Sequence, residues 1–267
     1  MQRDEALAAV IRAQGGAGFT PALLVWLAAV AAPDSVVGLA FGADGPPRVL
    51  FRQARATQVF ARLEAGYLAG AYLLDPFHAL HLRQAGAGAY RLCDVAPDAF
   101  SRSRYHEEYY RDTTLLDEIV LLARPQAGMT LMLCLGRDAT SGTGFDAADW
   151  AACRAAAPVA AALAERQWGG LQPGGSASDV VTALIAAARQ RDIGLSRRQA
   201  EVALMILRGH STASIALGLG VSAQTVKVFR RQLYMRCAIS SQAELFALML
   251  PMLANRISSA APTRTEG

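Results

Sequence analysis

The chain has 267 residues, of which 53% are hydrophobic and 18% are charged. This size and composition exclude global disorder and allow one large domain or two ordinary ones. The net charge is only +4, but from Gly194 onward there are nine basic and three acidic residues, which leaves the preceding part slightly negative. A basic C-terminal part on such a body indicates a polyanionic partner for that part.

Several kinds of site and location are excluded by what the sequence lacks. The cysteines have no CxxC or Cys/His spacing, and His78 and His81 have no third partner for a metal, so we expect no metal and no cofactor. Because Lys227 is the only lysine, a GxxxxGK[ST] phosphate loop is excluded. The most apolar stretch, Pro21 to Pro33, is too short to span a membrane, and the first residues lack the order of a signal peptide. We therefore expect a cytoplasmic protein with no membrane partner.

The N-terminal part mixes helical and strand periodicity. Helices are expected at 4–13, 21–32, 56–72, 101–111 and 146–167, the last with Asp146 as its N-cap and a kink or split at Pro158. Strands are expected at 35–41, 47–51 and 88–95 and in a hairpin over 116–137. Because the strands come as hairpins, the pattern predicts an α/β fold with an antiparallel sheet and flanking helices. This plan is similar to that of PAS and GAF sensor domains.

The clearest break in the chain is the Gly/Pro/Ser-rich stretch from Trp168 to Asp179, which is typical of an exposed linker. We expect a sensor-like, ligand-binding domain over 1–168, a linker over 169–179, a second domain over 180–257 and a flexible tail over 258–267.

The second domain is predicted to be all-α with four helices. Three serines are expected N-caps: Ser196, with Gln199 as its capping-box partner, Ser211 and Ser222. Gly209 and Gly220 are expected to end the first and second helices, and a last apolar helix follows Ser241. A tight glycine-containing turn joins the second helix to the third. This is the helix-turn-helix arrangement, which places the second helix of the pair in the major groove of double-stranded DNA.

The third helix, from Ser222 to about Cys237, has two different faces. At 100° per residue, one apolar stripe is formed by Val226, Phe229, Leu233 and Cys237. The opposite, acid-free face holds Gln224, Lys227, Val228 and Arg231, while Arg230 lies nearer the packed edge. Cations and amides are the groups that pair with guanine, adenine and phosphate, and an apolar side chain meets a thymine methyl group.

Residues 195–245 resemble the LuxR-type helix-turn-helix domain of bacterial transcription regulators, through matches that include Glu201, Gly209, Gly220 and the run from Thr225 to Val228. The resemblance implies a four-helix domain that works as a homodimer, often through the fourth helix. The DNA-contacting residues that we expect are Thr212, Ser222, Gln224, Thr225, Lys227, Val228, Arg230 and Arg231. The chain departs from the family pattern at three positions. The family often has a basic residue at the position of Ala213, an acidic residue at that of Ser214 and a histidine at that of Phe229.

The stretch from Gly66 to Arg83 is aromatic-rich and contains Asp75-Pro76, which makes it similar to the signal-binding domain of acyl-homoserine-lactone receptors. Arg62 stands where that family has a tryptophan. The candidate ligand-binding residues are Tyr67, Tyr72, Asp75, Phe77, Tyr90 and Tyr109. The alternative is that the aromatic residues are core and that Asp75 caps the turn before Pro76.

The run 101–118, rich in tyrosine and carboxylates, either binds an amine or a sugar or is a solvated helix face. No Ser/His/Asp or Cys/His motif stands out, so we expect no enzymatic activity. The sequence thus predicts a sequence-specific DNA-binding transcription regulator whose N-terminal domain senses a small-molecule effector. The alternatives are a ligand-free dimerisation or protein-interaction module in that place, or an acyl-homoserine-lactone receptor.

Overall fold

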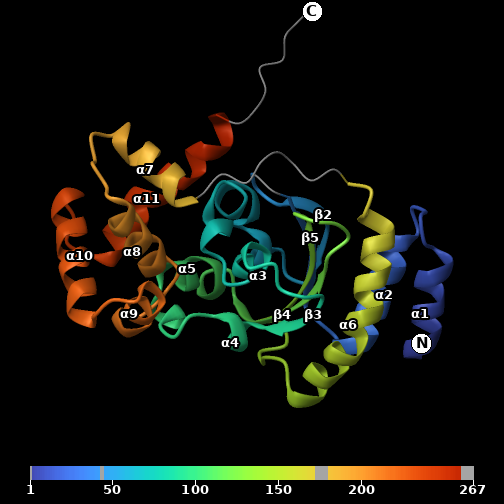
Figure 1. The fold of residues 1–267 in the computed structure, drawn as a ribbon. Coiled ribbons are helices and arrows are strands. Elements are labelled where there is room, and N and C mark those ends of the chain that lie inside the picture. The colour runs from blue at the N-terminus through green and yellow to red at the C-terminus, as the bar shows by residue number, and fades with distance from the viewer. Residues whose placement is uncertain (1, 43–44, 172–179, 260–267) are drawn as a thin grey trace, which may run out of the picture. The chain divides into compact units, whose positions relative to one another are not determined.

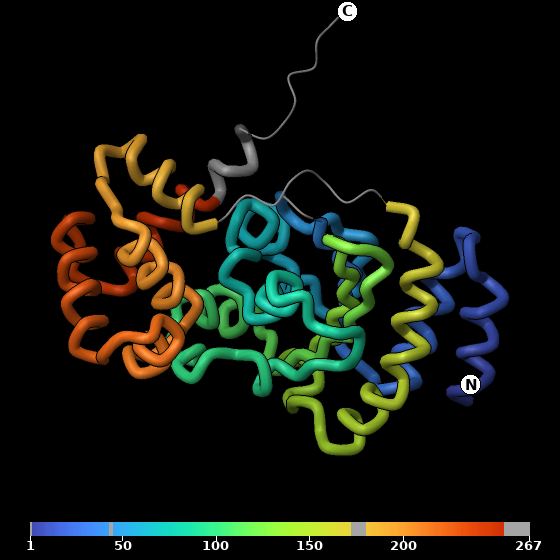
Figure 2. Tube along the Cα trace, in the orientation of Figure 1, coloured from blue at the N-terminus to red at the C-terminus, as the bar shows by residue number. Residues whose placement is uncertain are grey.

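The computed structural model describes residues 2–42, 45–171 and 180–259, with side chains up to Leu253. The chain divides into two compact units, each built from three segments whose order can be followed in Figures 1 and 2. Unit 1 comprises Met1–Ala61, Ala79–Val95 and Tyr110–Gly175, and unit 2 comprises Arg62–His78, Ala96–Tyr109 and Ser176–Gly267. The boundaries expected at 168 and 180 stay a prediction, and most of the expected linker and tail lies outside the described residues.

Unit 1 is organised around a five-stranded sheet of order β2-β1-β5-β4-β3, in which all neighbours are antiparallel. The strands are β1 (Ser35–Phe41), β2 (Arg48–Ala54), β3 (Gly88–Arg91), β4 (Leu115–Ala123) and β5 (Thr130–Asp138). The hairpins β1–β2 and β4–β5 are those that the alternating apolar pattern predicted. The fold class expected for the N-terminal part, an antiparallel sheet with flanking helices, is confirmed.

Three helices complete the core of unit 1: α1 (Arg3–Arg12), α2 (Phe19–Ala31) and α6 (Ala147–Trp168). Leu27 of α2, Ala160 of α6 and Leu135 of β5 are fully buried in one cluster. In Figure 1, α2 and α6 run side by side, and α2 also packs on α1. Asp146 caps α6 as predicted, whereas the helix is not split at Pro158.

Strand β3 ends earlier than the sequence predicted. Residues 88–91 pair with β4, but Leu92–Val95 forms the short helix α4. Arg91 and Asp94 make two hydrogen bonds of 2.8 and 2.9 Å, a spacing of three residues that suits a helical turn. The expectation of a strand over the whole of 88–95 was therefore wrong for its second half.

The segments expected as regular helices at 56–72 and 101–111 are not regular. The first is divided into the 3₁₀ turn η1 (Thr57–Phe60), the π-helical turn η2 (Leu63–Tyr67) and the 3₁₀ turn η3 (Ala71–Leu74). The second is divided into η4 (Phe100–Arg102), α5 (Arg104–His106) and the π-helical turn η5 (Glu107–Arg111). The two segments approach each other closely at Gly66, where a Cβ atom would clash with the Tyr109 hydroxyl.

The C-terminal helices of unit 2 are α7 (Val180–Arg189), α8 (Arg197–Leu207), α9 (Thr212–Leu219), α10 (Ala223–Arg236) and α11 (Gln242–Ser259). The four helices that the sequence predicted are α8 to α11, and α7 is an additional one. Leu245, Phe246 and Met249 of α11 are buried, and α11 packs against α7, α8, η3 and α5. The fold class expected for this part, a helix-turn-helix domain, is confirmed.

Within the described ranges, no single helix is both long enough and apolar enough to cross a membrane. The bent pair α9 and α10 meets that criterion jointly, by length and composition only.

Candidate nucleic-acid interface and sensor cluster

The helix-turn-helix begins and ends at capping residues that the sequence placed correctly. The hydroxyl oxygen of Ser196 accepts a hydrogen bond from the Gln199 amide at 3.2 Å, and the Gln199 side chain accepts one from the Ser196 amide at 3.0 Å. Ser211 caps α9 and Ser222 caps α10, each by accepting a hydrogen bond from the backbone amide three residues later. Gly220 ends α9 with φ +64°, a conformation that favours glycine. Each boundary is therefore encoded locally.

Helices α9 and α10 are bent by 105° across the turn between them. This value lies within the range of about 90–120° that helix-turn-helix pairs adopt. Val226 and Leu233 of α10 and Ile215 of α9 are almost completely buried, and α10 packs on both α8 and α9. The apolar stripe thus fixes the orientation of α10.

The opposite face of α10 is open. Gln224, Lys227 and Arg231 are exposed, and 44% of the surface of Val228 is accessible. The helix contains no acidic residue. The structure therefore groups two cations, an amide and a small apolar side chain on one face, as the helical period predicted.

The other predicted contact residues lie at the rim of this face. Ser222 is exposed at the start of α10, and its hydroxyl lies 2.8 Å from the Thr225 hydroxyl. Arg230 is half-buried, with its guanidinium carbon 5.2 Å from the centre of the Tyr234 ring. Thr212 is half-buried in the first turn of α9. The cation–π contact of Arg230 was not foreseen, although Tyr234 follows it by four residues.

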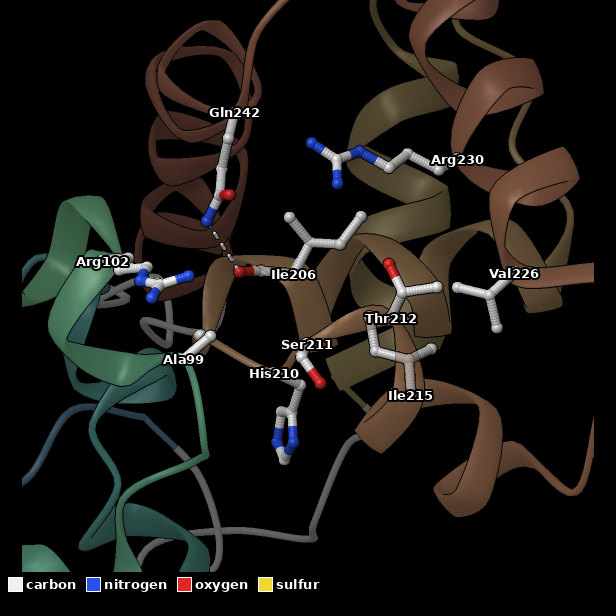
Figure 3. A pocket seen from close by; sticks show the side chains of 11 residues that line it. Ala99, Arg102, Ile206, His210, Ser211, Thr212, Ile215, Val226, Arg230 and Gln242 are labelled. Carbon is white, nitrogen blue, oxygen red and sulfur yellow. Dashed lines mark hydrogen bonds between the residues drawn. The ribbon is translucent and has the colours of Figure 1, made fainter. Parts of the chain in front are cut away.

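A cavity of about 240 Å³ lies beside this rim within unit 2. Figure 3 shows that the guanidinium groups of Arg102 and Arg230 point toward the space between them, with Thr212 and Ser211 below. The amide of Gln242 donates to the Ile206 carbonyl at 3.1 Å along one wall. No acidic side chain is among the residues that line it. The cavity is thus polar and carries two guanidinium groups.

Most of the candidate ligand-binding residues form one cluster, the sensor cluster, which consists of Tyr67, Tyr72, Asp75, Phe77 and Tyr109 in unit 2. The ring centre of Tyr67 lies 6.4 Å from those of both Tyr72 and Tyr109, in edge-on arrangements. Tyr67 and Tyr109 belong to the π-helical turns η2 and η5. Such turns occur frequently at functional sites.

Asp75 is the polar centre of the sensor cluster. One carboxylate oxygen accepts a hydrogen bond from the Tyr67 hydroxyl at 2.7 Å, and the other accepts one from the Phe77 amide at 2.8 Å. The second bond is an Asx-type turn, so Asp75 has the capping role that was one of the two interpretations. Desolvation raises the pKa of Asp75 to about 6, although both hydrogen bonds act to lower it.

Tyr90 differs from the other candidates because it belongs to β3 of unit 1, where its hydroxyl donates to the Gly86 carbonyl at 2.8 Å. Tyr105 is a member of the cluster that sequence reasoning missed. Its ring is stacked on Tyr109, with centres 4.7 Å apart and planes at 23°. The spacing of four residues was the available signal, but η5 is π-helical and its register was not foreseen.

The run 101–118 is not a solvated helix face. Tyr105, Tyr109 and Tyr110 are buried, and Arg104 forms ion pairs with Glu107 and Glu108. Burial and the charge of Glu108 raise the pKa of Tyr109 to about 12. Among the described residues, no group of three or more His, Cys, Asp or Glu side chains is arranged to hold a metal ion.

Comparison with known proteins identifies the family of this chain. Residues 194–249 match the model of bacterial regulatory proteins of the luxR family. A protein of Aeromonas salmonicida, named as an HTH-type transcriptional regulator in the exeN 3′ region, is 33% identical over 185 residues, which cover 66% of this chain and 93% of that protein. The chain belongs to the LuxR family of bacterial regulatory proteins. The predicted membership is confirmed, and this LuxR-family chain is a DNA-binding transcription regulator.

Solved structures extend the likeness to the N-terminal part of the LuxR-family chain. The VqsR LBD domain from Pseudomonas aeruginosa is 24% identical with a TM-score of 0.53, and the match covers 63% of this chain and 98% of that domain. Escherichia coli SdiA is 16% identical with a TM-score of 0.41, over 94% of this chain and 97% of SdiA. The VqsR match shows a shared fold.

Proposed function

We propose that α10 enters the major groove of double-stranded DNA and reads its sequence with Gln224, Lys227, Val228 and Arg231. The observation that carries this proposal is the division of α10 into a buried apolar stripe and an exposed, acid-free face. A side chain can reach a base edge only if it is exposed on the helix that lies in the groove.

Each of these side chains has a chemically defined role. Lys227 and Arg231 pair with guanine O6 and N7 or with phosphate, Gln224 pairs with adenine N6 and N7, and Val228 contacts a thymine methyl group. The residues at the rim bind the DNA backbone and thereby fix the position of α10: Ser222, Thr225, Arg230 and Thr212. Each base contact contributes about 1–3 kcal/mol of discrimination.

The sensor cluster binds a small-molecule effector in this proposal. It combines four buried aromatic side chains with a carboxylate that already accepts two hydrogen bonds, which suits a ligand with an apolar body and a hydrogen-bond donor. The similar VqsR domain of Pseudomonas aeruginosa is named an LBD domain, which supports the same role. An acyl-homoserine lactone is one candidate effector.

The alternative is that the N-terminal domain, residues 1–168, is a ligand-free dimerisation module. Thermal unfolding of the full chain against a metabolite panel discriminates between the two. A metabolite that raises the midpoint in the wild type, but less in Tyr67→Phe, supports the effector. Chemical conversion of such a metabolite by the protein would show that the domain is an enzyme, and it would contradict the proposed sensing role. We also propose that the protein acts in the cytoplasm, because a bacterial regulator that binds chromosomal DNA must be where that DNA is.

The DNA contact is tested by selecting duplexes from a random pool with the full chain. The selected duplex is then titrated with the wild type and with Arg231→Ala, which should bind about 10- to 100-fold more weakly. Arg197→Ala is the matched control, because Arg197 is exposed on α8 and pairs with Glu201. Equal affinities of Arg231→Ala and Arg197→Ala would show that α10 does not read the DNA.

A further inference from the structure

The turn between α8 and α9 is covered by a segment that lies outside the predicted DNA-binding domain. Residues 98–100, which we call the latch, belong to unit 2 together with this turn. The Ala99 amide donates to the Gly209 carbonyl at 3.0 Å. Asp98 bonds to Ser211, which caps α9. The latch therefore rests on the start of the first helix of the helix-turn-helix.

The Asp98 carboxylate takes both free donors of Ser211. One of its oxygens accepts from the Ser211 amide at 2.9 Å, and the other accepts from the Ser211 hydroxyl. These bonds hold the pKa of Asp98 below its usual value, so the carboxylate is charged at neutral pH. Asp98 is itself an exposed residue, so burial does not explain why it lies there.

Backbone packing makes the contact specific. Gly209 has φ +91°, and a Cβ atom at this position would lie 2.7 Å from the Cα atom of Phe100. Phe100 is buried. A side chain at residue 209 would therefore both strain the turn and push the latch away. A second hydrogen bond connects this turn to another segment of unit 2, because Arg208 Nε donates to the Leu73 carbonyl of η3 at 3.2 Å.

The groups that Asp98 occupies are those that a phosphate would use. The first helix of a helix-turn-helix crosses the DNA backbone, and phosphate oxygens accept hydrogen bonds from amides and hydroxyls at a helix N-terminus. Thr212, the next residue, is one of our proposed backbone contacts. Arg102 and Arg230 line the cavity that also includes Ser211, so the surroundings favour an anion.

We propose that Asp98 takes the place of a DNA backbone phosphate at the start of α9, so that the latch and DNA exclude each other. The contact is autoinhibitory: unit 2 as described is the form that does not bind DNA, and the latch must leave the turn before α9 can contact the backbone. This inference rests on the proposed function, because it requires that α9 crosses DNA.

The test compares the affinity of the full chain for a selected duplex in three proteins: wild type, Asp98→Ala and Asp192→Asn. Asp192 is exposed with φ +60°, which asparagine also adopts, so this control removes one negative charge without touching the latch. Loss of the charge-assisted contact should make Asp98→Ala bind about tenfold more tightly, while Asp192→Asn stays within about twofold of the wild type.

The hydrogen-exchange rate of the Ala99 amide is a second measurement, and it does not change merely because the protein has lost a negative charge. In the wild type, the Ala99 amide is protected by its bond to Gly209, and saturating duplex should accelerate its exchange. The inference is overturned if Asp98→Ala binds no more tightly than the wild type, or if the Ala99 amide stays protected in the complex. If no protein binds any duplex, the proposed DNA contact is wrong as well, and the two failures are thereby distinguished.

Discussion

Exposure divides the side chains of α10 residue by residue. Val226 and Leu233 are almost completely buried, whereas Lys227 and Arg231 are exposed one and five residues after Val226. This division could be predicted from the sequence because a period of 3.6 residues assigns each position to a face. The contacts of Arg230 with Tyr234 and of Asp98 with Ser211 could not, because they depend on rotamers and on a tertiary approach.

Asp75 should make the stability of the protein depend on pH. Its pKa is about 6 in the folded state against an ordinary value of 3.8, so between these values the folded state keeps a proton that the unfolded state releases. The free energy of unfolding therefore falls as the pH rises from about 4 to about 6, by up to about 2 kcal/mol. Asp75→Asn should lose this dependence.

The measurement is chemical denaturation at several pH values, with Asp192→Asn as the control. The wild type and Asp192→Asn should lose stability relative to Asp75→Asn between pH 4 and pH 6 and then run parallel to it. Parallel curves over the whole range would mean that the Asp75 carboxyl is not desolvated.

At the scale of the element, prediction succeeded where the signals are local. The caps of α8, α9 and α10 and the two β-hairpins need only neighbouring residues, and they lie where the sequence placed them. Turns η2 and η5 were expected as parts of regular α-helices. In the structure, η2 and η5 approach each other at Gly66 and Tyr109, which are far apart in the sequence. Periodicity carries no information about such an approach.

The C-terminal end of α9 provides a matched pair of glycine substitutions. Gly220 has φ +64°, so Gly220→Ala should destabilise the protein by about 1 kcal/mol. Gly218 lies inside α9, where a Cβ atom would meet only the flexible end of Met205 at 3.1 Å. Gly218→Ala should therefore be neutral or stabilise by up to about 1 kcal/mol. Thermal unfolding of both variants measures the difference, and equal midpoints would contradict the left-handed C-cap.

At the scale of the whole molecule, each of the two compact units combines segments that are far apart in the sequence. Segments 62–78 and 96–109 belong to the same unit as α7 to α11, although the sequence places them in the N-terminal half. The Gly/Ser-rich composition of 169–179 predicts a linker, but composition does not reveal which distant segments pack together. The sensor cluster and the latch both lie in these two segments, which brings the proposed effector site and the proposed inhibitory contact into one unit.

We expect the homodimer that the LuxR resemblance implies, and a homodimer requires a DNA site with two-fold symmetry. Two copies of α10 related by a two-fold axis read two half-sites about 10 base pairs apart, or a multiple of that distance. Duplexes selected by the full chain should therefore contain an inverted repeat with this spacing, as sequencing of the selected pool reveals. A single asymmetric element that binds one protomer would contradict the dimer.

The central claim is that the exposed face of α10 contacts DNA, and Lys227 tests it most directly because it is the only lysine in the chain. An amine-reactive reagent followed by mass spectrometry measures the accessibility of this one side chain without any mutation. We predict that Lys227 reacts readily in the free protein, is protected by saturating selected duplex, and reacts again at a salt concentration that dissociates the complex. Unchanged labelling of Lys227 in the saturated complex would contradict the account.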